Sequence, residues 1–223
     1  MEKLKLSNVT LVCVSNVKHD IQLKVIDHCM ELVDFGEAIF ITNINLKHNN
    51  NKIKIIQTDE LSNISYPKDW SEFMIYKLKN FINTDFCLVV HNDGFIVNPE
   101  SWTDEFLKYD YIGSPWQNNT FIDDNGEIIR VGNGGFSLRS KKLLNVFIDL
   151  NIPWEAYRDH WHDDGFISMA HLKELREYGI LIPDAQLAYK FGREKNCDDL
   201  NNSIKPFGFH GYFEGTDSYV RFN

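Results

Sequence analysis

The sequence lacks several features that would assign it to well-known classes of protein. No apolar run approaches the roughly 20 residues that a membrane-spanning helix needs, so none is predicted. Basic residues are outnumbered, with 23 Lys and Arg against 32 Asp and Glu and a formal net charge of −9. This balance argues against nucleic acid or an anionic membrane surface as a partner, because either would need a basic patch.

Cysteine is also sparse, and its distribution is informative. The four cysteines are scattered, and no pair has the spacing of a zinc site. Cys13 and Cys87 lie inside apolar segments, where a buried free thiol is expected. The N-terminal residues lead into a strand-like segment and not into a signal-peptide core. These observations predict a reducing, cytoplasmic location.

What is present is enough for one folded domain. The chain has 223 residues with 43% hydrophobic content, so we expect a single domain over 1–223 with a buried core. Its first half, about 1–98, alternates apolar strand-like segments with segments of helical periodicity. This pattern predicts an α/β fold with a mostly parallel central sheet flanked by helices. The expected strands are 9–14, 38–42, 53–56 and 86–91, and the expected helices are 21–32 and 67–81.

The second half, about 99–223, is less regular. Turn residues between 121–122 and 128–129 predict a hairpin. Ser140 is expected to cap a helix that ends near Leu150, and Gly179 to end a helix from Asp163 to Tyr178. The remaining predictions are a helix over 99–108, strands over 109–113, 136–139 and 180–182, and a polar loop over 192–206.

The predicted strand at 86–90 ends in the tetrapeptide His91-Asn92-Asp93-Gly94. Ligands of parallel sheets bind at the carboxyl ends of strands, and a carboxylate there can hold a metal or a sugar hydroxyl. Oxygen ligands suit Mg²⁺ and Mn²⁺, and His91 could add a nitrogen. Asn-Asp-Gly is equally a favourable turn, and a histidine at a strand end can be simply hydrogen-bonded.

Three later motifs favour a ligand site over a simple turn at residues 91–94. Gly132-Asn133-Gly134-Gly135 either lets a ligand approach the backbone closely or forms a tight connection between strands. Asp163 and Asp164 begin a predicted helix, where one can cap it and the other can serve as a general base. His210, between aromatic residues and glycines, is either a core residue or a metal ligand from far along the chain.

Taken in order, these motifs resemble the glycosyltransferase-like domains of the GT-A superfamily. The most specific parts are residues 109–116, Tyr-Asp-Tyr-Ile-Gly-Ser-Pro-Trp, and residues 132–139, Gly-Asn-Gly-Gly-Phe-Ser-Leu-Arg. The resemblance covers roughly residues 9–212 and is nearest to a subgroup found in bacteria, fungi and large viruses. It implies transfer of a sugar from a nucleotide donor, usually with a divalent metal.

The resemblance also implies roles for individual residues. Asp93 matches the surviving acid of the Asp-x-Asp metal motif, His91 stands at its first position, and His210 matches a C-terminal metal-binding histidine. Asp164, with Asp163 as second choice, matches the catalytic base. The implied donor contacts are Ser15, Asn16, Asp59, Asn92 and Asp93. The implied acceptor or sugar pocket comprises Trp116, Gly132, Asn133, Gly134, Gly135, Trp161 and His162.

We therefore expect an inverting glycosyltransferase that uses Mn²⁺ or Mg²⁺. Its expected donor is a nucleotide sugar, foremost a UDP-sugar, and its expected acceptor is a hydroxyl of a carbohydrate or glycan. Two other classes remain open on the same residues. A carbohydrate-binding protein would not need the acidic pair, and a metal-dependent hydrolase would direct the same carboxylates at water.

Overall fold

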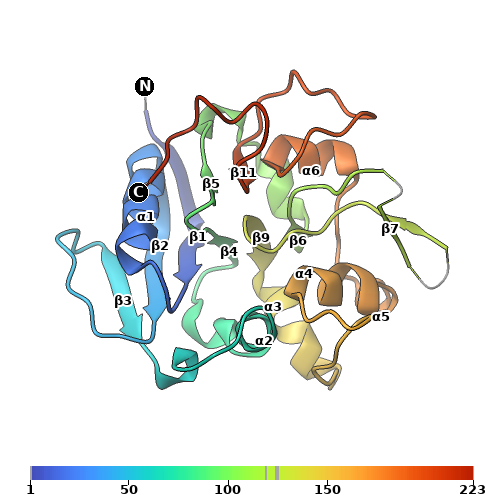
Figure 1. Cartoon of the computed structure of the whole chain (residues 1–223), viewed down its shortest axis with the longest axis horizontal. Helices are drawn as coiled ribbons and strands as arrows, with labels where there is room; N and C mark the ends of the chain where they lie inside the picture. Colours follow the sequence, from blue (N-terminus) through green and yellow to red (C-terminus); the bar gives the residue numbers. More distant parts are fainter. Residues whose placement is uncertain (1, 119, 124–125, 223) are drawn as a thin grey trace.

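The computed structural model describes residues 2–118, 120–123 and 126–222, which fold around one central sheet (Figure 1). In this part of the chain the sheet has six strands in the order β3-β2-β1-β4-β9-β6. Their bounds are β1 Leu4–Val14, β2 Val33–Thr42, β3 Ile53–Gln57, β4 Phe86–Val89, β6 Tyr111–Ile112 and β9 Ser137–Ser140. β1, β2, β3 and β4 pair in parallel, whereas β9 runs antiparallel to both β4 and β6.

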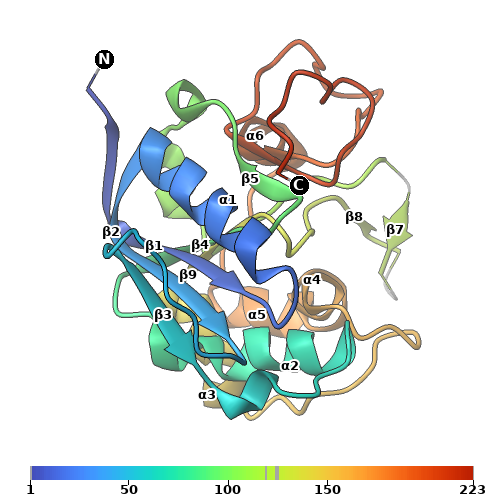
Figure 2. The ribbon, with the colours of Figure 1, turned by 60° about the vertical axis from the view of Figure 1, so that its left-hand side comes forward.

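Helices cover both faces of the sheet, which is why β4 and the second half of β1 are almost entirely apolar. Leu11 and Cys13 of β1 belong to the core shared with α1, His19–Leu32, whereas Val12 and Val14 belong to the core shared with α2, Lys68–Tyr76. This alternation is the two-residue period of a strand buried on both sides. Figure 2 shows α1 on one face and α2 on the other. The predicted α/β architecture with a mostly parallel sheet is confirmed.

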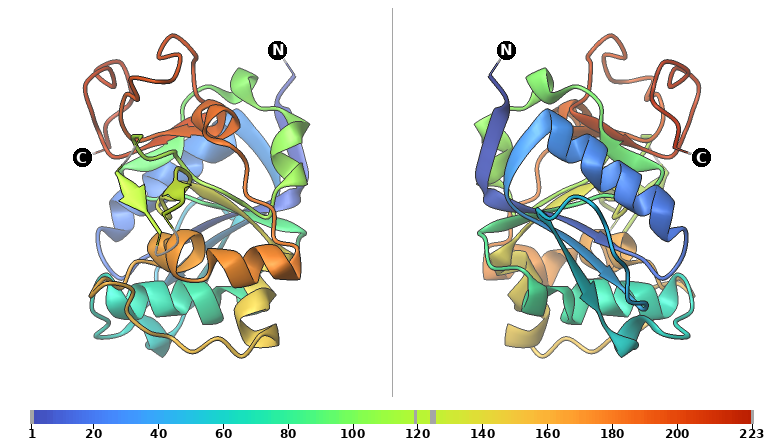
Figure 3. Two further views of the ribbon diagram at one scale, coloured as in Figure 1. Left: turned by 90° about the vertical axis from the view of Figure 1, so that its right-hand side faces the viewer. Right: turned by 90° about the vertical axis from the view of Figure 1, so that its left-hand side faces the viewer.

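The remaining helices follow the same division into layers. Figure 3 shows α6, Ala185–Phe191, on the same side of the sheet as α1. On the opposite side lie α3, Lys141–Asp149, and α5, Leu172–Tyr178, which share a core around Phe147 and Leu175. In the part of the chain that the structure describes, no helix is both long and apolar enough to cross a membrane.

Local signals in the second half are partly confirmed. The Ser140 hydroxyl accepts a hydrogen bond from the Leu143 N–H and caps α3, and Gly179, with a φ of 90°, ends α5. Strands β7, Phe121–Ile122, and β8, Ile128–Ile129, form the expected hairpin, although part of its turn, residues 124 and 125, lies outside the described residues.

Three predictions for this half are wrong. Residues 99–108 form two 3₁₀ turns, Pro99–Ser101 and Asp104–Lys108, because the Thr103 hydroxyl caps a new turn by accepting from the Glu105 N–H. The segment 180–182 is not a strand: the Leu181 N–H donates to the Asp110 side chain, which replaces a regular ladder. The helix over 163–178 is interrupted, with α4 at Asp163–Gly165, a π-helical turn at Phe166–Ala170 and then α5.

A small second sheet brings distant segments of the chain together. It has the order β10-β11-β5, with β10 at Gly192–Arg193, β11 at Gly208–His210 and β5 at Gly94–Ile96. The predicted polar loop at 192–206 therefore begins as a strand, and helix α6 before it had no predicted counterpart. In the register, His210 lies opposite Gly94. This pairing places the C-terminal histidine beside the end of β4.

Candidate active site

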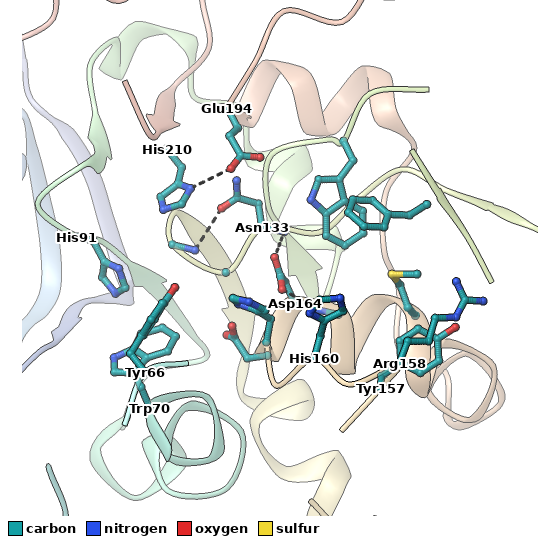
Figure 4. A pocket seen from close by; sticks show the side chains of 18 residues that line it. Tyr66, Trp70, His91, Asn133, Tyr157, Arg158, His160, Asp164, Glu194 and His210 are labelled. Carbon is teal, nitrogen blue, oxygen red and sulfur yellow. Dashed lines mark hydrogen bonds and ion pairs between the residues drawn. The ribbon is translucent and has the colours of Figure 1, made fainter. Parts of the chain in front are cut away.

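A pocket of about 580 Å³ opens where the central sheet meets the small sheet (Figure 4). Many of the predicted residues line it, although they come from segments far apart in the sequence. These are His91, Trp116, Asn133, Gly134, Gly135, His162, Asp163, Asp164 and His210. The pairing of β4 with β9 brings the end of β4 beside the glycine-rich segment, and β11 adds His210. The structure thus gathers the three later motifs around one cavity.

Other predicted residues, all within the described part of the chain, do not line this pocket. Ser15 is buried, and its hydroxyl donates to the Val17 carbonyl. The Gln22 side chain joins Ser15 to Asn92 by donating to both, at 3.5 and 3.2 Å. The others that do not line it are Asn16, Asp59, Asp93, Gly132 and Trp161. The predicted donor contacts therefore lie outside the cavity itself.

The glycine-rich segment is shaped by close approach and not by positive φ at its glycines. A Cβ on Gly134 would lie 2.6 Å from Asp163 Oδ1, and one on Gly135 would lie 2.1 Å from His210 Nε2. Gly132 is packed against the Trp116 ring in the same way. The residue with positive φ is Asn133, at 65°. The glycines are needed because side chains of the site press against their backbone.

We expect Gly134→Ala to lower the free energy of unfolding by about 1–3 kcal/mol, the usual cost of inserting a methyl group into a packed site. The Asp163 carboxylate cannot move away easily, because it forms an ion pair with Arg139. Gly165→Ala is the matched control, since a Cβ at Gly165 meets nothing within 4 Å. Denaturant unfolding of both variants checks this, and equal stability of the two would show that the segment tolerates a side chain.

Asp163 is committed to a buried ion pair. Its Oδ2 lies 2.5 Å from Arg139 Nη2, and the two side chains are 5% and 1% exposed. Arg139 also donates to the Gly134 carbonyl and to the Ser137 hydroxyl. The expectation that one aspartate of the pair caps the helix is wrong, because His162 is the N-cap and its side chain makes no capping bond. Asp163 instead neutralises Arg139, which donates to the Gly134 carbonyl of the glycine-rich segment.

Asp164 has different surroundings. Its carboxylate accepts hydrogen bonds from the Asn133 N–H at 3.0 Å and from the Gly165 N–H at 2.7 Å. Burial, together with the negative charge of Asp163, raises the pKa of Asp164 above its usual value. A carboxylate with a raised pKa at a pocket wall is a better proton acceptor than an ordinary one. Of the two aspartates, Asp164 is the one available to a ligand.

His91 presents an unused nitrogen to this site. Its ring meets the Trp70 ring edge-on, with centroids 5.1 Å apart. Burial, and the nearby His210, lower the pKa of His91 to about 4, so the imidazole is neutral near pH 7. Its Nε2 is buried and has no hydrogen-bond partner among the described residues. A buried polar atom without a partner is costly, which indicates a position that a ligand satisfies.

Glu194 directly follows β10 and was not predicted. Its Oε1 lies 3.6 Å from His210 Nδ1. Burial would raise the pKa of Glu194, but His210 and the Asn133 side chain lower it below its usual value. Burial would likewise lower the pKa of His210, but Glu194 and Asp93 raise it. A glutamate in a polar segment carries no signal by itself, and only the pairing of β10 with β11 reveals its position.

Further residues that the sequence did not single out form the outer part of the pocket. Tyr66 is 73% exposed at its mouth, and the pKa of Tyr66 is raised by partial burial and by the charges of Asp163, Asp164 and Asp93. On the other side a tight turn, residues 157–160, has φ values of 49° and 64° at its two central residues. From this turn, Tyr157, Arg158 and His160 face the cavity.

The expected metal ligands form only part of a metal site. Within the described residues, no group of three or more His, Cys, Asp or Glu side chains is placed to hold a metal. Asp93 lies near both imidazoles, since its charge raises the pKa of His91 and of His210. The free, neutral Nε2 of His91 is a suitable nitrogen ligand. A divalent ion at this place would need further ligands from substrate oxygens or water.

Comparisons with known proteins add a family but no residue roles. No curated protein matches the chain. Thirty-nine chains of solved structures match its fold. One is an active-site mutant of LgtC, with a TM-score of 0.49 and 10% sequence identity, covering 92% of this chain and 87% of that chain. Similarity at this level assigns no activity. Residues 52–210, well over half of the chain, match the model of a family described as "Protein of unknown function (DUF5672)", and the chain therefore belongs to that family.

Proposed function

We propose that the protein is a glycosyltransferase that moves a sugar from a nucleotide-diphosphate donor to a hydroxyl acceptor, with Asp164 as the general base. The observation that carries the proposal is the difference between two adjacent aspartates. Both line the pocket, but Asp163 is neutralised by Arg139, whereas Asp164 accepts two backbone hydrogen bonds and has a raised pKa. The resemblance of the motifs to GT-A domains supports the same reading. The order of these motifs along the chain is independent of the pocket geometry.

The reaction follows from this arrangement. The acceptor hydroxyl lies within hydrogen-bond reach of Asp164, which takes its proton as the oxygen attacks the anomeric carbon. A bond forms between that oxygen and the anomeric carbon while the bond from the carbon to the diphosphate breaks. The electron pair of the broken bond leaves with the nucleoside diphosphate. Attack from the face opposite the leaving group inverts the anomeric configuration.

The leaving diphosphate gains negative charge, and the chain offers little to offset it. The protein has a net charge of −9, and Arg139 is already paired. Asp93, His91 and His210 would hold Mn²⁺ or Mg²⁺ together with diphosphate oxygens. The ion would supply positive charge at the leaving group. The Trp70 ring packs edge-on against His91 and restricts rotation of the imidazole.

The test of the proposal is donor turnover with and without acceptors. A thermal-shift screen of nucleotide sugars with Mn²⁺ identifies the donor, because a bound ligand raises stability by RT ln(1 + [L]/Kd). Sugar transfer to an added glycan is the expected result. Release of free sugar alone, unaffected by any acceptor, would identify a hydrolase. Binding of sugars without turnover would identify a carbohydrate-binding protein.

We expect Asp93→Asn to remove most of the metal dependence of diphosphate binding. In the wild-type protein, UDP should bind more tightly with Mn²⁺ than with a chelator, because the ion joins the phosphates to an acidic protein. The variant should bind UDP about equally in both conditions. Calorimetric titrations of both proteins measure this. Equal affinity of the wild-type protein with Mn²⁺ and with chelator would contradict the role of Asp93.

A further inference from the structure

Glu194 lies beside His210, one of the proposed metal ligands, and near Asn133. Figure 4 shows its carboxylate close to His210, on the same side of the pocket as Asn133. Its side chain is 31% exposed and that of His210 is 25% exposed, so neither is sealed in the core. None of the steps proposed above uses Glu194. Its position therefore needs a separate explanation.

The contact with Glu194 favours one of the two neutral tautomers of His210. Nδ1 is buried, has no hydrogen-bond partner among the described residues, and lies 3.6 Å from Glu194 Oε1. An ionised carboxylate only accepts, so the neutral ring is favoured with its hydrogen on Nδ1. Nε2 then carries a lone pair that can bind a metal. Metal-binding histidines commonly donate their other N–H to a carboxylate, and Nδ1 of His210 is the nitrogen nearest Glu194.

Asn133 connects Glu194 with Asp164, the proposed base. The Asn133 side chain lies near enough to Glu194 to lower the pKa of that carboxyl, and it accepts from the Gly135 N–H at 3.3 Å. The Asn133 N–H in turn donates to Asp164 at 3.0 Å. Asn133 has a φ of 65°, a left-handed conformation that a residue other than glycine keeps only when its surroundings hold it. The bonds to Gly135 and Asp164 hold Asn133 in this conformation, and Glu194 lies beside it.

We propose that Glu194 is the positioning residue of the site, whose carboxylate holds His210 as the Nδ1–H tautomer and, through Asn133, sets the place of Asp164. One side chain thereby fixes the metal-binding end and the base end of the pocket together. The ligand roles of His210 and Asp164 rest on the proposed glycosyl transfer. The tautomer and the Asn133 contact do not depend on it.

The first experiment needs neither substrate nor metal. Two-bond ¹⁵N correlation spectra of the ligand-free protein, at alkaline pH where the imidazoles are neutral, report the tautomer of His210. We expect Nδ1–H in the wild-type protein and in Glu194→Gln, whose amide oxygen still accepts. In Glu194→Ala we expect a mixture of both tautomers. Glu177→Gln, at an exposed position of α5, is the matched control and should match the wild type.

The second experiment measures the effect on ligand binding. Changes to carboxylates behind metal-binding histidines cost about 10- to 100-fold in metal affinity or activity. We expect Glu194→Ala to raise the Mn²⁺ concentration for half-maximal UDP binding by that factor and also to lower kcat. Glu194→Gln, which keeps the Asn133 contact but loses the charge, should raise the Mn²⁺ requirement with a smaller loss of kcat. Equal losses of kcat in the two variants would contradict the link through Asn133.

Failure of this proposal and failure of the proposed function give different results. Nε2–H as the wild-type tautomer would overturn the role of Glu194 whatever the protein catalyses, and requires no variant to fold. An unchanged tautomer in Glu194→Ala would do the same. If no nucleotide sugar is bound or turned over by the wild-type protein but the tautomer shifts as expected, the positioning of His210 stands and glycosyl transfer fails.

Discussion

Asp164→Asn should lower the rate of sugar transfer by roughly 10²- to 10⁴-fold, the usual contribution of a general base. Asparagine has nearly the same shape, and its amide oxygen can still accept from the Asn133 or Gly165 N–H. It cannot take a proton from an acceptor hydroxyl. The decrease should therefore appear in kcat, while donor affinity and the melting temperature stay near the wild-type values.

Two further measurements constrain this role. NMR of the product made by the wild-type protein should show inverted anomeric configuration, and retention would exclude attack by the acceptor in a single displacement. Donor binding by Asp164→Asn, measured by calorimetry, is the control for an intact pocket. A variant that binds donor normally and turns it over at the wild-type rate would remove Asp164 from the mechanism.

The acid side of the pH profile should report the same carboxylate. Burial first, and then the charge of Asp163, raise the pKa of Asp164. A base must be deprotonated, so kcat/KM should fall as the pH decreases through this raised pKa, at a higher pH than for an exposed aspartate. Asp164→Asn should lose that limb of the profile. If kcat/KM of Asp164→Asn still fell at the same acid pH, the titrating group would be a residue other than Asp164.

The first half of the fold was predictable because its signals are local. Strand β4 and the second half of β1 are nearly continuous apolar runs, and α1 and α2 carry apolar residues at helical spacing, so period and composition agree. The predicted limits were too short at the starts of both β1 and β2, where polar and half-buried residues precede the apolar runs. There, the pairing of β1 with β2 extends both strands beyond their apolar residues.

The second half depends on contacts between distant segments, which a single sequence does not display. Leu181 is held by the Asp110 carboxylate, 71 positions away, and β10 exists only because β11 lies beside it. The 3₁₀ turn at Asp104–Lys108 follows from a cap at Thr103 that competes with a longer helix. In each case a tertiary contact or a side-chain bond overrides the local pattern.

The residues of the candidate site also fall into two groups, those that a local sequence pattern reveals and those that only the fold brings together. Motifs with unusual composition, such as the glycine-rich segment and the acidic pair, could be found from the sequence and do line one pocket. Glu194 and Tyr66 could not, because each is an ordinary residue in an ordinary segment until the fold places it. The pairing of Asp163 with Arg139 was also hidden, since 24 positions separate them.

This hidden ion pair leads to the largest expected effect on stability. Both side chains are almost fully buried, and removing one partner leaves the other charge buried without compensation. Such changes cost about 3–5 kcal/mol. We therefore expect Asp163→Asn to lower the free energy of unfolding by that amount, well beyond the roughly 1 kcal/mol that loss of a helix cap would cost. Unfolding in urea, followed by circular dichroism, measures the difference.

The chain offers a matched control for burial. Arg176 and Glu127 form an equally direct ion pair at 2.8 Å, but their side chains are 52% and 47% exposed. Arg176→Gln should cost at most about 1 kcal/mol, because water solvates the remaining charge. Replacing Arg139 and Asp163 together by Met and Leu should recover part of the loss, since no charge then remains buried. If Asp163→Asn were no more destabilising than Arg176→Gln, the buried pair would not hold the glycine-rich segment in place.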